Sequence, residues 1–247
     1  MVTKNRYFAD PAVGVMISLA LRKESPMRVK LIFIIFFLLV STPALWAEDA
    51  KNYISKGNQF VKTQDYKNAA KEYEEALKVD PENAYATLLL GMTYANLKDY
   101  DKALQYAEKA VKLQPGFTAY YNLGLIYANK NETKKALQAL DQALAANPAS
   151  YQAHYQKGAL YSSQKEYAKA IESYQQSIKL NPQYDKALLG LAGAYYFQGD
   201  KATAQKQVEE LRKIGQKQEA DGLEVWINER EKLSAKGSTI PANEPPS

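Results

Sequence analysis

The sequence has no cysteine and a single histidine, His154. The absence of cysteine excludes disulfides, thiolate metal sites and a cysteine nucleophile, and one histidine excludes a histidine-rich metal cluster. The sequence contains no phosphate-binding loop, and the adjacent pairs Glu74-Glu75 and Glu209-Glu210 point to different sides of a helix. We therefore predict that the protein is not an enzyme and that it has no catalytic residues, no cofactor and no metal site.

Most of the chain also lacks an excess of one charge sign. The net charge is +5, but residues 1–47 hold six Lys or Arg against two Asp or Glu, so +4 belongs to them and +1 to the other 200 residues. A domain near neutrality has no field that attracts a polyanion. We therefore predict that the protein does not bind nucleic acid.

One unbroken apolar run, LIFIIFFLLV, covers residues 31–40. Arg28 and Lys30 precede it, and a small-residue segment ending in Ala47 follows it. A basic flank, a short apolar stretch and small residues are typical of a secretory signal, and the run is shorter than the roughly 20 residues of a spanning helix. We predict a signal peptide over residues 27–47, cleaved after Ala47 or, alternatively, after Ala44.

The predicted signal implies an exported protein, periplasmic or secreted. In the alternative, the leader is not cleaved, and residues 31–46 anchor the protein in the inner membrane with the repeats outside the cytoplasm. We expect no membrane contact other than this anchor. Met27 opens a signal of normal length. Residues 1–26 are therefore interpreted as a spurious or unstructured N-terminal extension.

Three residue series repeat along the body of the chain with one shared period. Each series is spaced 34, 33 and 34 residues apart. The members are Gly57, Gly91, Gly124 and Gly158; Ala69, Ala103, Ala136 and Ala170; and Pro81, Pro115, Pro148 and Pro182. Because the three series share one period and one single-residue deletion, the sequence predicts an array of repeated structural units.

This pattern resembles the tetratricopeptide repeat family, whose 34-residue unit reads W-x2-L-G-x2-Y…A-x3-F…P. The third unit matches best, through Tyr120, Leu123, Gly124, Tyr127, Ala136, Leu140, Ala143 and Pro148. The resemblance implies an all-α, right-handed solenoid of antiparallel helix pairs, with about five repeats within residues 50–216. The expected units are 50–83, 84–116, 117–150, 151–184 and 185–216, the last with Ala192 for glycine and Gln216 for proline.

The boundaries within each unit follow from helix physics. Small residues are expected where the two helices cross. An acidic residue begins each second helix, because a negative charge is favourable at the positive end of the helix dipole and an Asp side chain can also cap the helix.

After the array, Leu223, Trp226 and Ile227 lie on one side of an amphipathic pattern. We predict a capping helix over 217–235, because a solenoid must cover its last open face, and a disordered tail over 236–247.

The first helices carry a second stripe of residues at positions i, i+4 and i+8. In the tetratricopeptide repeat family this face lines the concave groove that holds a peptide or protein segment. The predicted partner-binding residues are Asn58, Tyr85, Met92, Asn96, Tyr121, Leu125, Asn129 and Tyr155. Amides offer a donor and an acceptor to an extended backbone, and tyrosines offer rigid contact area. In the alternative interpretation, the asparagines satisfy helix ends and the tyrosines pack on their neighbours.

Some members of the family hold a C-terminal carboxylate with paired basic and asparagine residues. Asn58 fits one such place, but Ile54, Leu89, Thr118 and Asn122 occupy the others, so a charged chaperone tail is not expected. The predicted function is a protein–protein interaction scaffold in a bacterial cell-envelope assembly, with a protein or peptide partner. Two alternatives stay open: a self-associating structural protein, and an envelope glycan-binding module.

Overall fold

The computed structural model describes residues 49–235. The predicted extension, signal peptide and C-terminal tail lie outside these residues. The described part contains eleven helices and no strand. They are the helix over residues 49–62, α3 (Tyr66–Val79), α4 (Ala84–Asn96), α5 (Tyr100–Leu113), α6 (Phe117–Asn129), α7 (Thr133–Ala146), α8 (Tyr151–Ser163), α9 (Tyr167–Leu180), α10 (Asp185–Gln198), α11 (Lys201–Lys213) and α12 (Lys217–Ala235).

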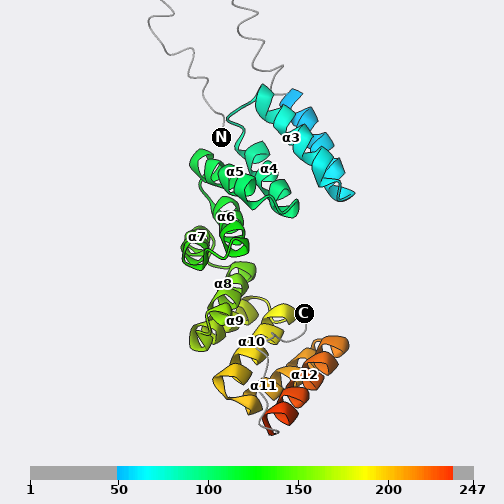
Figure 1. The fold of residues 1–247 in the computed structure, drawn as a ribbon, viewed down its shortest axis with the longest axis vertical. Coiled ribbons are helices and arrows are strands. Elements are labelled where there is room, and N and C mark those ends of the chain that lie inside the picture. The colour runs from blue at the N-terminus through cyan, green and yellow to red at the C-terminus, as the bar shows by residue number, and fades with distance from the viewer. Residues whose placement is uncertain (1–48, 236–247) are drawn as a thin grey trace, which may run out of the picture.

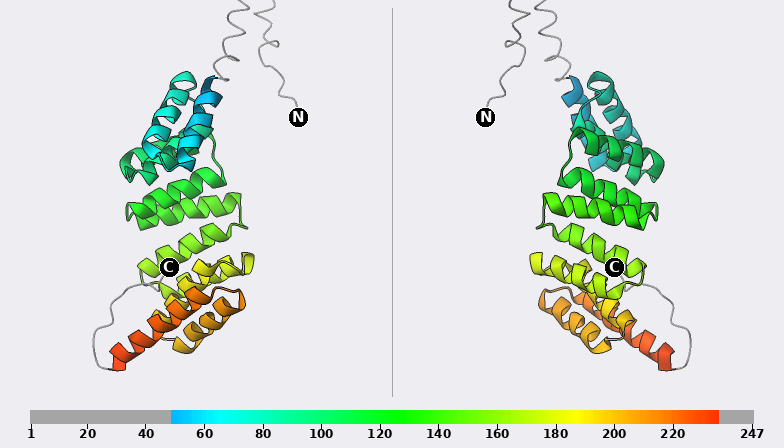
Figure 2. Two further views of the ribbon diagram at one scale, coloured as in Figure 1. Left: turned by 90° about the vertical axis from the view of Figure 1, so that its right-hand side faces the viewer. Right: turned by 90° about the vertical axis from the view of Figure 1, so that its left-hand side faces the viewer.

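The helices pack as consecutive antiparallel pairs that stack along the long axis of the molecule (Figures 1 and 2). In Figure 1 the array curves around an open side at the right. Helices α4, α6, α8 and α10 lie nearer to this open side, and α5, α7 and α9 lie farther from it. The predicted all-α solenoid of antiparallel helix pairs is confirmed. Within the described residues, no helix is long and apolar enough to span a membrane.

The turn between the two helices of a unit has a similar backbone conformation in all five units. One residue in each turn has a positive φ: Gln64, Lys98, Asn131, Lys165 and Gly199. The acidic residue that follows donates its backbone N–H to the carbonyl five residues earlier, as Asp65 does to Phe60 at 2.9 Å. This bond closes the first helix and aims the second one back along it.

The role of these acidic residues depends on the length of the side chain. The aspartates cap the second helix by accepting from the backbone N–H three residues later: Asp65, Asp99 and Asp200. Glu132 and Glu166 stand at the same position without a side-chain cap, and each forms an ion pair with a lysine three residues on, Lys135 and Lys169. The prediction that Asp caps the second helix is confirmed.

The two helices of a unit approach most closely at the repeated glycines. A Cβ added at Gly57 would overlap the ring of Tyr73, and one at Gly158 would lie 2.6 Å from the ring of Tyr174. Both rings are buried, so they have no free space into which to move. The crossing point therefore requires glycine wherever the facing second helix carries a tyrosine.

Neighbouring units are joined by a tyrosine of one first helix and a polar side chain of the preceding second helix. Tyr94 donates its hydroxyl hydrogen to Glu74, Tyr127 donates to Glu108 at 2.9 Å, and Gln175 Nε2 donates to the Tyr195 hydroxyl at 2.9 Å. Burial, together with the Glu108 carboxylate, raises the pKa of Tyr127 to about 12. These bonds help to set how one unit is rotated against the one before it at three of the four junctions between units.

Helix α12 covers the C-terminal end of the array. Its buried residues Leu223, Trp226 and Ile227 pack against α10 and α11. The turn before it resembles the turns within units: Gly215 has a φ of +84°, and the Gln216 N–H donates to Leu211 at 2.9 Å. The other repeats have proline at the position of Gln216. Proline has no N–H, so its replacement makes this different turn possible.

Candidate ligand groove

The first helices of the second, third and fourth units present one continuous set of side chains towards the open side. The opposite face of these helices packs on the second helices, so the set lies on the free face. Each member is exposed or half-buried. We call it the groove surface: Tyr85, Leu88, Met92 and Asn96 on α4; Thr118, Tyr121, Leu125 and Asn129 on α6; and Gln152, Tyr155, Ala159 and Ser163 on α8.

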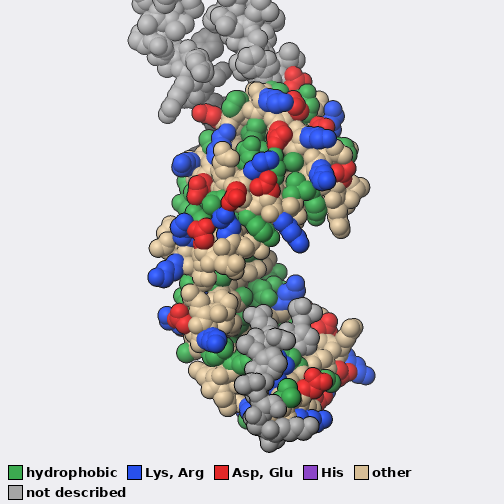
Figure 3. Space-filling model, viewed as in Figure 1, with side chains coloured by type: hydrophobic (Ala, Val, Ile, Leu, Met, Phe, Trp, Pro, Cys, Tyr) green, Lys and Arg blue, Asp and Glu red, His purple; other side chains and the backbone are tan. Residues whose placement is uncertain are grey.

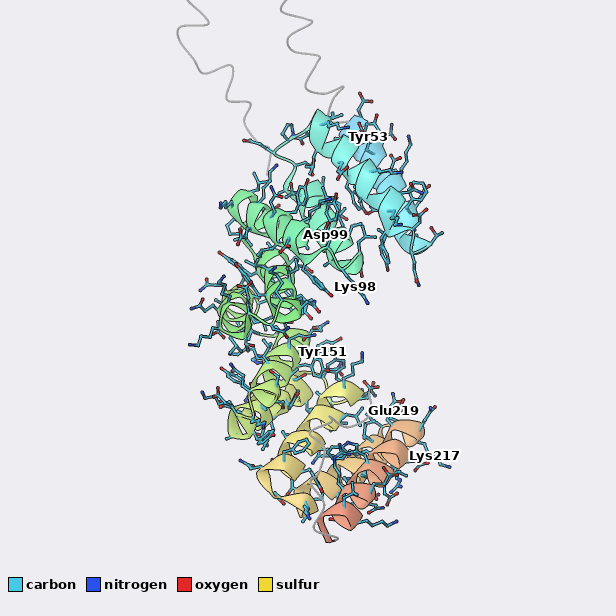
Figure 4. The ribbon with its side chains drawn as sticks, in the orientation of Figure 1. Tyr53, Lys98, Asp99, Tyr151, Lys217 and Glu219 are labelled. Atoms are coloured by element: carbon cyan, nitrogen blue, oxygen red, sulfur yellow. The ribbon has the colours of Figure 1, made fainter. Side chains whose placement is uncertain are left out.

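The space-filling view shows the molecule hollowed on this side, between an upper and a lower lobe (Figure 3). Hydrophobic side chains show in the middle of the hollow, with a Lys or Arg side chain beside them, and most Lys, Arg, Asp and Glu side chains in this view lie on the two lobes. Tyr151, which begins α8, and Lys98, in the turn after α4, lie on this open side in Figure 4. The hollow thus coincides with the first helices of the middle units.

Two of the predicted residues are large apolar side chains that face solvent. Tyr85 is 54% exposed and Met92 is 38% exposed. They stand seven residues apart on α4, which places them on the same face two turns apart. A single exposed apolar side chain is ordinary, but aligned ones on a concave face indicate a contact surface.

The predicted asparagines Asn96 and Asn129 are both exposed at equivalent places in successive units. Each Nδ2 donates to its own helix, Asn96 to the Met92 carbonyl at 3.0 Å and Asn129 to the Leu125 carbonyl at 2.9 Å. The amides therefore satisfy carbonyls near the end of their own helices, and their role in binding a partner stays a prediction. Within the described residues neither amide oxygen accepts a hydrogen bond, so each can still accept one from a ligand.

Tyr121 and Tyr155 each belong to a packed aromatic group, Phe117 with Tyr121 and Tyr151 with Tyr155 and Tyr184. Tyr121 is near enough to Tyr151 and Tyr184 to interact with both electrostatically, and we call the five residues together the aromatic cluster. Phe117 and Tyr121 stack with ring centroids 5.4 Å apart, and Tyr184 meets Tyr151 and Tyr155 edge-on at 4.9 and 5.2 Å. All five are half-buried. Burial raises the pKa of Tyr121 and raises that of Tyr184 to about 12. The tyrosines are thus held rigidly, each with part of its surface exposed.

The structure does not bring every predicted position into the groove surface. In the first unit, Asn58 accepts a hydrogen bond from the Tyr73 hydroxyl at 2.7 Å, and Ile54 is part of the core. In the fifth unit, Leu189 is buried and the ring of Phe197 meets Trp226 at 5.8 Å. The uncharged part of the stripe is therefore open over the three middle units of the described array, and the exposed residues Lys62 and Lys186 lie beyond its two ends.

Sequence reasoning missed Phe117, Tyr151 and Tyr184 as members of the cluster. Tyr184 lies in the connection before α10, and the other two begin α6 and α8. Phe117 and Tyr151 lie one four-residue step before Tyr121 and Tyr155, where the stripe was taken to begin, and Tyr184 lies outside the first helices. Phe117 and Tyr151 occupy equivalent places one period apart, and this repeated aromatic position was the signal available in the sequence.

With this geometry in hand, comparison with known proteins identifies the family. Models of the tetratricopeptide repeat match residues 54–116, 95–151 and 151–184. Together the matches cover more than half of the chain. The chain belongs to the tetratricopeptide repeat family.

Curated relatives match over short stretches. The chain is similar to small glutamine-rich tetratricopeptide repeat-containing protein 2 of Saccharomyces cerevisiae, with 36% identity over 76 residues, which are 31% of this chain and 21% of that protein. It is similar to Hsp70-Hsp90 organizing protein 3 of Arabidopsis thaliana, with 39% identity over 67 residues, 27% of this chain and 12% of that protein. The matches thus span about a fifth or less of these relatives.

Solved structures match over most of the described array. A structure of MamA is 28% identical, with a TM-score of 0.60 over 79% of this chain and 100% of that one. MamA residues 41 to the end from Desulfovibrio magneticus RS-1 is 26% identical, with a TM-score of 0.63 over 69% and 97%. YrrB, described as having an unusual peptide-binding site, is 21% identical with a TM-score of 0.59 over 76% and 94%, and shows the shared fold alone.

Proposed function

We propose that the protein is an interaction scaffold that binds an extended segment of another protein along the groove surface. The observation that carries the proposal is the continuity of this surface over three successive units. In each unit the same face of the first helix offers an apolar or aromatic side chain, and in the second and third it ends in an exposed amide, Asn96 or Asn129. Such alternation suits a peptide, which presents side chains and backbone groups in turn.

The names of the relatives support a scaffolding role, since one group is named for organizing Hsp70 and Hsp90. The groove surface argues that this chain binds a different kind of segment. Thr118 and Asn122 provide no positive charge on α6, and Leu89 provides no amide on α4. The one matching amide, Asn58, already has its oxygen bonded to Tyr73. We therefore propose a partner other than an acidic chaperone tail.

We further propose that the protein acts outside the cytoplasm, in a bacterial cell-envelope assembly. This rests on the basic flank, the ten-residue apolar run and the small residues before Glu48. The exported protein is expected to begin at Glu48 or close to it, as measured by intact mass. A mature species that still contains residues 28–40 would show that the segment is a membrane anchor instead.

Site-specific photocrosslinking tests the scaffold proposal in the native cell. Benzoylphenylalanine placed at Tyr85 or Met92 reports on the groove surface, because both side chains are exposed. The matched controls are Lys134 and Gln138, exposed on the outer face of α7. We expect a discrete protein adduct from the groove positions and none from α7. Adducts from α7 alone would contradict the proposal, and a dimer of the chain itself would favour the self-associating alternative.

A further inference from the structure

The groove surface contains no charged residue, although the same units are rich in charge elsewhere. Helices α4 and α6, AYATLLLGMTYAN and FTAYYNLGLIYAN, have no Asp, Glu, Lys, Arg or His. In α8 the ionisable residues other than tyrosine are His154 and Lys157, which contact the Pro148 carbonyl at 3.2 Å and Asp141 of α7 at 2.6 Å. Neither belongs to the groove surface. By contrast, α5 alone carries five charged side chains.

Charged side chains lie around the groove surface and not on it. Lys186, exposed in the first turn of α10, is the equivalent of Thr118 and Gln152 in the next unit. Lys98 lies in the turn after α4, and Lys217 and Glu219 lie at the start of α12 (Figure 4). A ligand charge brought onto the groove surface would lose its hydration without gaining an ion partner, which is unfavourable. A neutral segment meets no such cost. The lining therefore selects by excluding charged ligands as much as by attracting neutral ones.

The aromatic cluster adds a place for one side chain. Tyr121 of α6 and Tyr155 of α8 belong to the groove surface. The ring of Phe117 stacks on Tyr121, and the ring of Tyr184 packs edge-on against Tyr155. Clustered aromatic rings with exposed portions are surfaces on which proline and other flat or apolar side chains dock. Because these rings are already ordered by their neighbours, little conformational entropy is lost when a ligand binds.

Building on the proposed function, we propose that the groove binds a charge-poor extended polypeptide segment, anchored by a proline or aromatic side chain on the aromatic cluster. The amides of Asn96 and Asn129 contact its backbone, and Met92 and Leu125 contact its other apolar side chains. The attraction is therefore apolar and hydrogen-bonded in character. Binding is expected to change less than threefold between about 50 mM and about 500 mM salt, a range over which a pairing of exposed charges is strongly screened.

Peptide display on the full-length chain tests this proposal directly, because the selection does not require the natural partner. A random peptide library is selected on the unaltered chain and on a Tyr121→Ala, Asn129→Ala variant. We expect enriched peptides that lack charge over a central stretch and contain proline or an aromatic residue there. Their affinity should fall at least 30-fold on the variant, the scale of a central anchor residue.

The outcomes separate the two proposals. Enrichment of acidic or basic peptides that still lose binding on the variant would overturn the charge-poor inference and leave the groove as the binding surface. Enrichment that is the same on the variant, or none at all, would overturn the groove proposal itself. If the variant fails to fold by circular dichroism, the conservative Tyr121→Phe change with Asn129→Ala takes its place.

A second variant adds charge without removing core packing. Thr118 and Gln152 are exposed at equivalent places on α6 and α8. Thr118→Lys with Gln152→Lys should therefore fold normally and place two cations on the groove surface. We expect its selected peptides to become acidic and their binding to become salt-dependent. Unchanged charge-poor selection by this variant would contradict the inference, because the lining charge would then have no part in specificity.

Discussion

Replacing Trp226 by alanine should loosen the C-terminal end of the array before the rest. Trp226 is 7% exposed, and its ring meets Tyr196 at 5.1 Å and Phe197 at 5.8 Å, with the Arg230 guanidinium 4.1 Å from its centroid. Truncating a buried tryptophan costs about 3–5 kcal/mol. Its indole N–H has no hydrogen-bond partner among the described residues, which is itself unfavourable. We therefore expect the free energy of unfolding to fall by about 3 kcal/mol, the lower end of this range.

A loss of this size is large beside the roughly 5–15 kcal/mol that stabilises a domain, and it corresponds to about 6–12 °C in the melting temperature. Repeats couple mainly to their neighbours, so α10 and α11 should lose hydrogen-exchange protection first. The matched control is Val225→Ala, next in sequence and 56% exposed, which should change stability by about 0.5 kcal/mol or less. Unchanged protection over α10 and α11 in the Trp226 variant would refute the capping role of α12.

Two further predictions follow from the packing. Gly158→Ala should lower the free energy of unfolding by about 1–3 kcal/mol, because its Cβ meets Tyr174 at 2.6 Å. Gly116→Ala, with nothing within 4 Å of the added Cβ, should lower it by only about 0.5 kcal/mol, since glycine is preferred over alanine at the N-cap of α6. Equal losses would contradict the close approach at Gly158. The pKa of an unfolded tyrosine is about 10, and burial together with Glu108 raises the pKa of Tyr127 to about 12. The stability from this raised pKa is therefore complete below pH 10 and is lost as the pH rises towards 12. In the Tyr127→Phe variant, the denaturant midpoint of unfolding should fall less steeply between pH 10 and pH 12 than in the unaltered chain. An equally steep fall in both would contradict this.

The fold could be predicted from the sequence because every unit repeats the same physical requirements. Glycine at the crossing, an acidic residue at the second helix and proline after it recur at one period, so each unit supports the interpretation of the others. Side-chain length at the acidic position even predicts which residues cap, Asp65 but not Glu132. The turn before α12 differs from the other connections between units at the position where Gln216 replaces the repeated proline.

The groove residues could be predicted only in part, because their surroundings differ from unit to unit. The periodic stripe places equivalent positions on one face, but it does not say what covers that face. In the first unit Tyr73 engages Asn58, and in the fifth Trp226 packs on Phe197. Both partners lie outside the stripe. The aromatic cluster was missed for the same reason, since Tyr184 reaches it from the connection before α10.

The most direct test of the groove proposal is the affinity of the crosslinked partner for an Asn96→Ala, Asn129→Ala variant. Both side chains are exposed and bond only to their own helices within the described residues, so the thermal stability should barely change. Losing two hydrogen bonds of about 0.5–1.5 kcal/mol each predicts binding weakened about 5- to 150-fold. The control, Lys134→Ala with Gln142→Ala on the outer face of α7, should bind normally. Full affinity of the asparagine variant, with a lowered melting temperature, would contradict the account and show that the amides serve the fold alone.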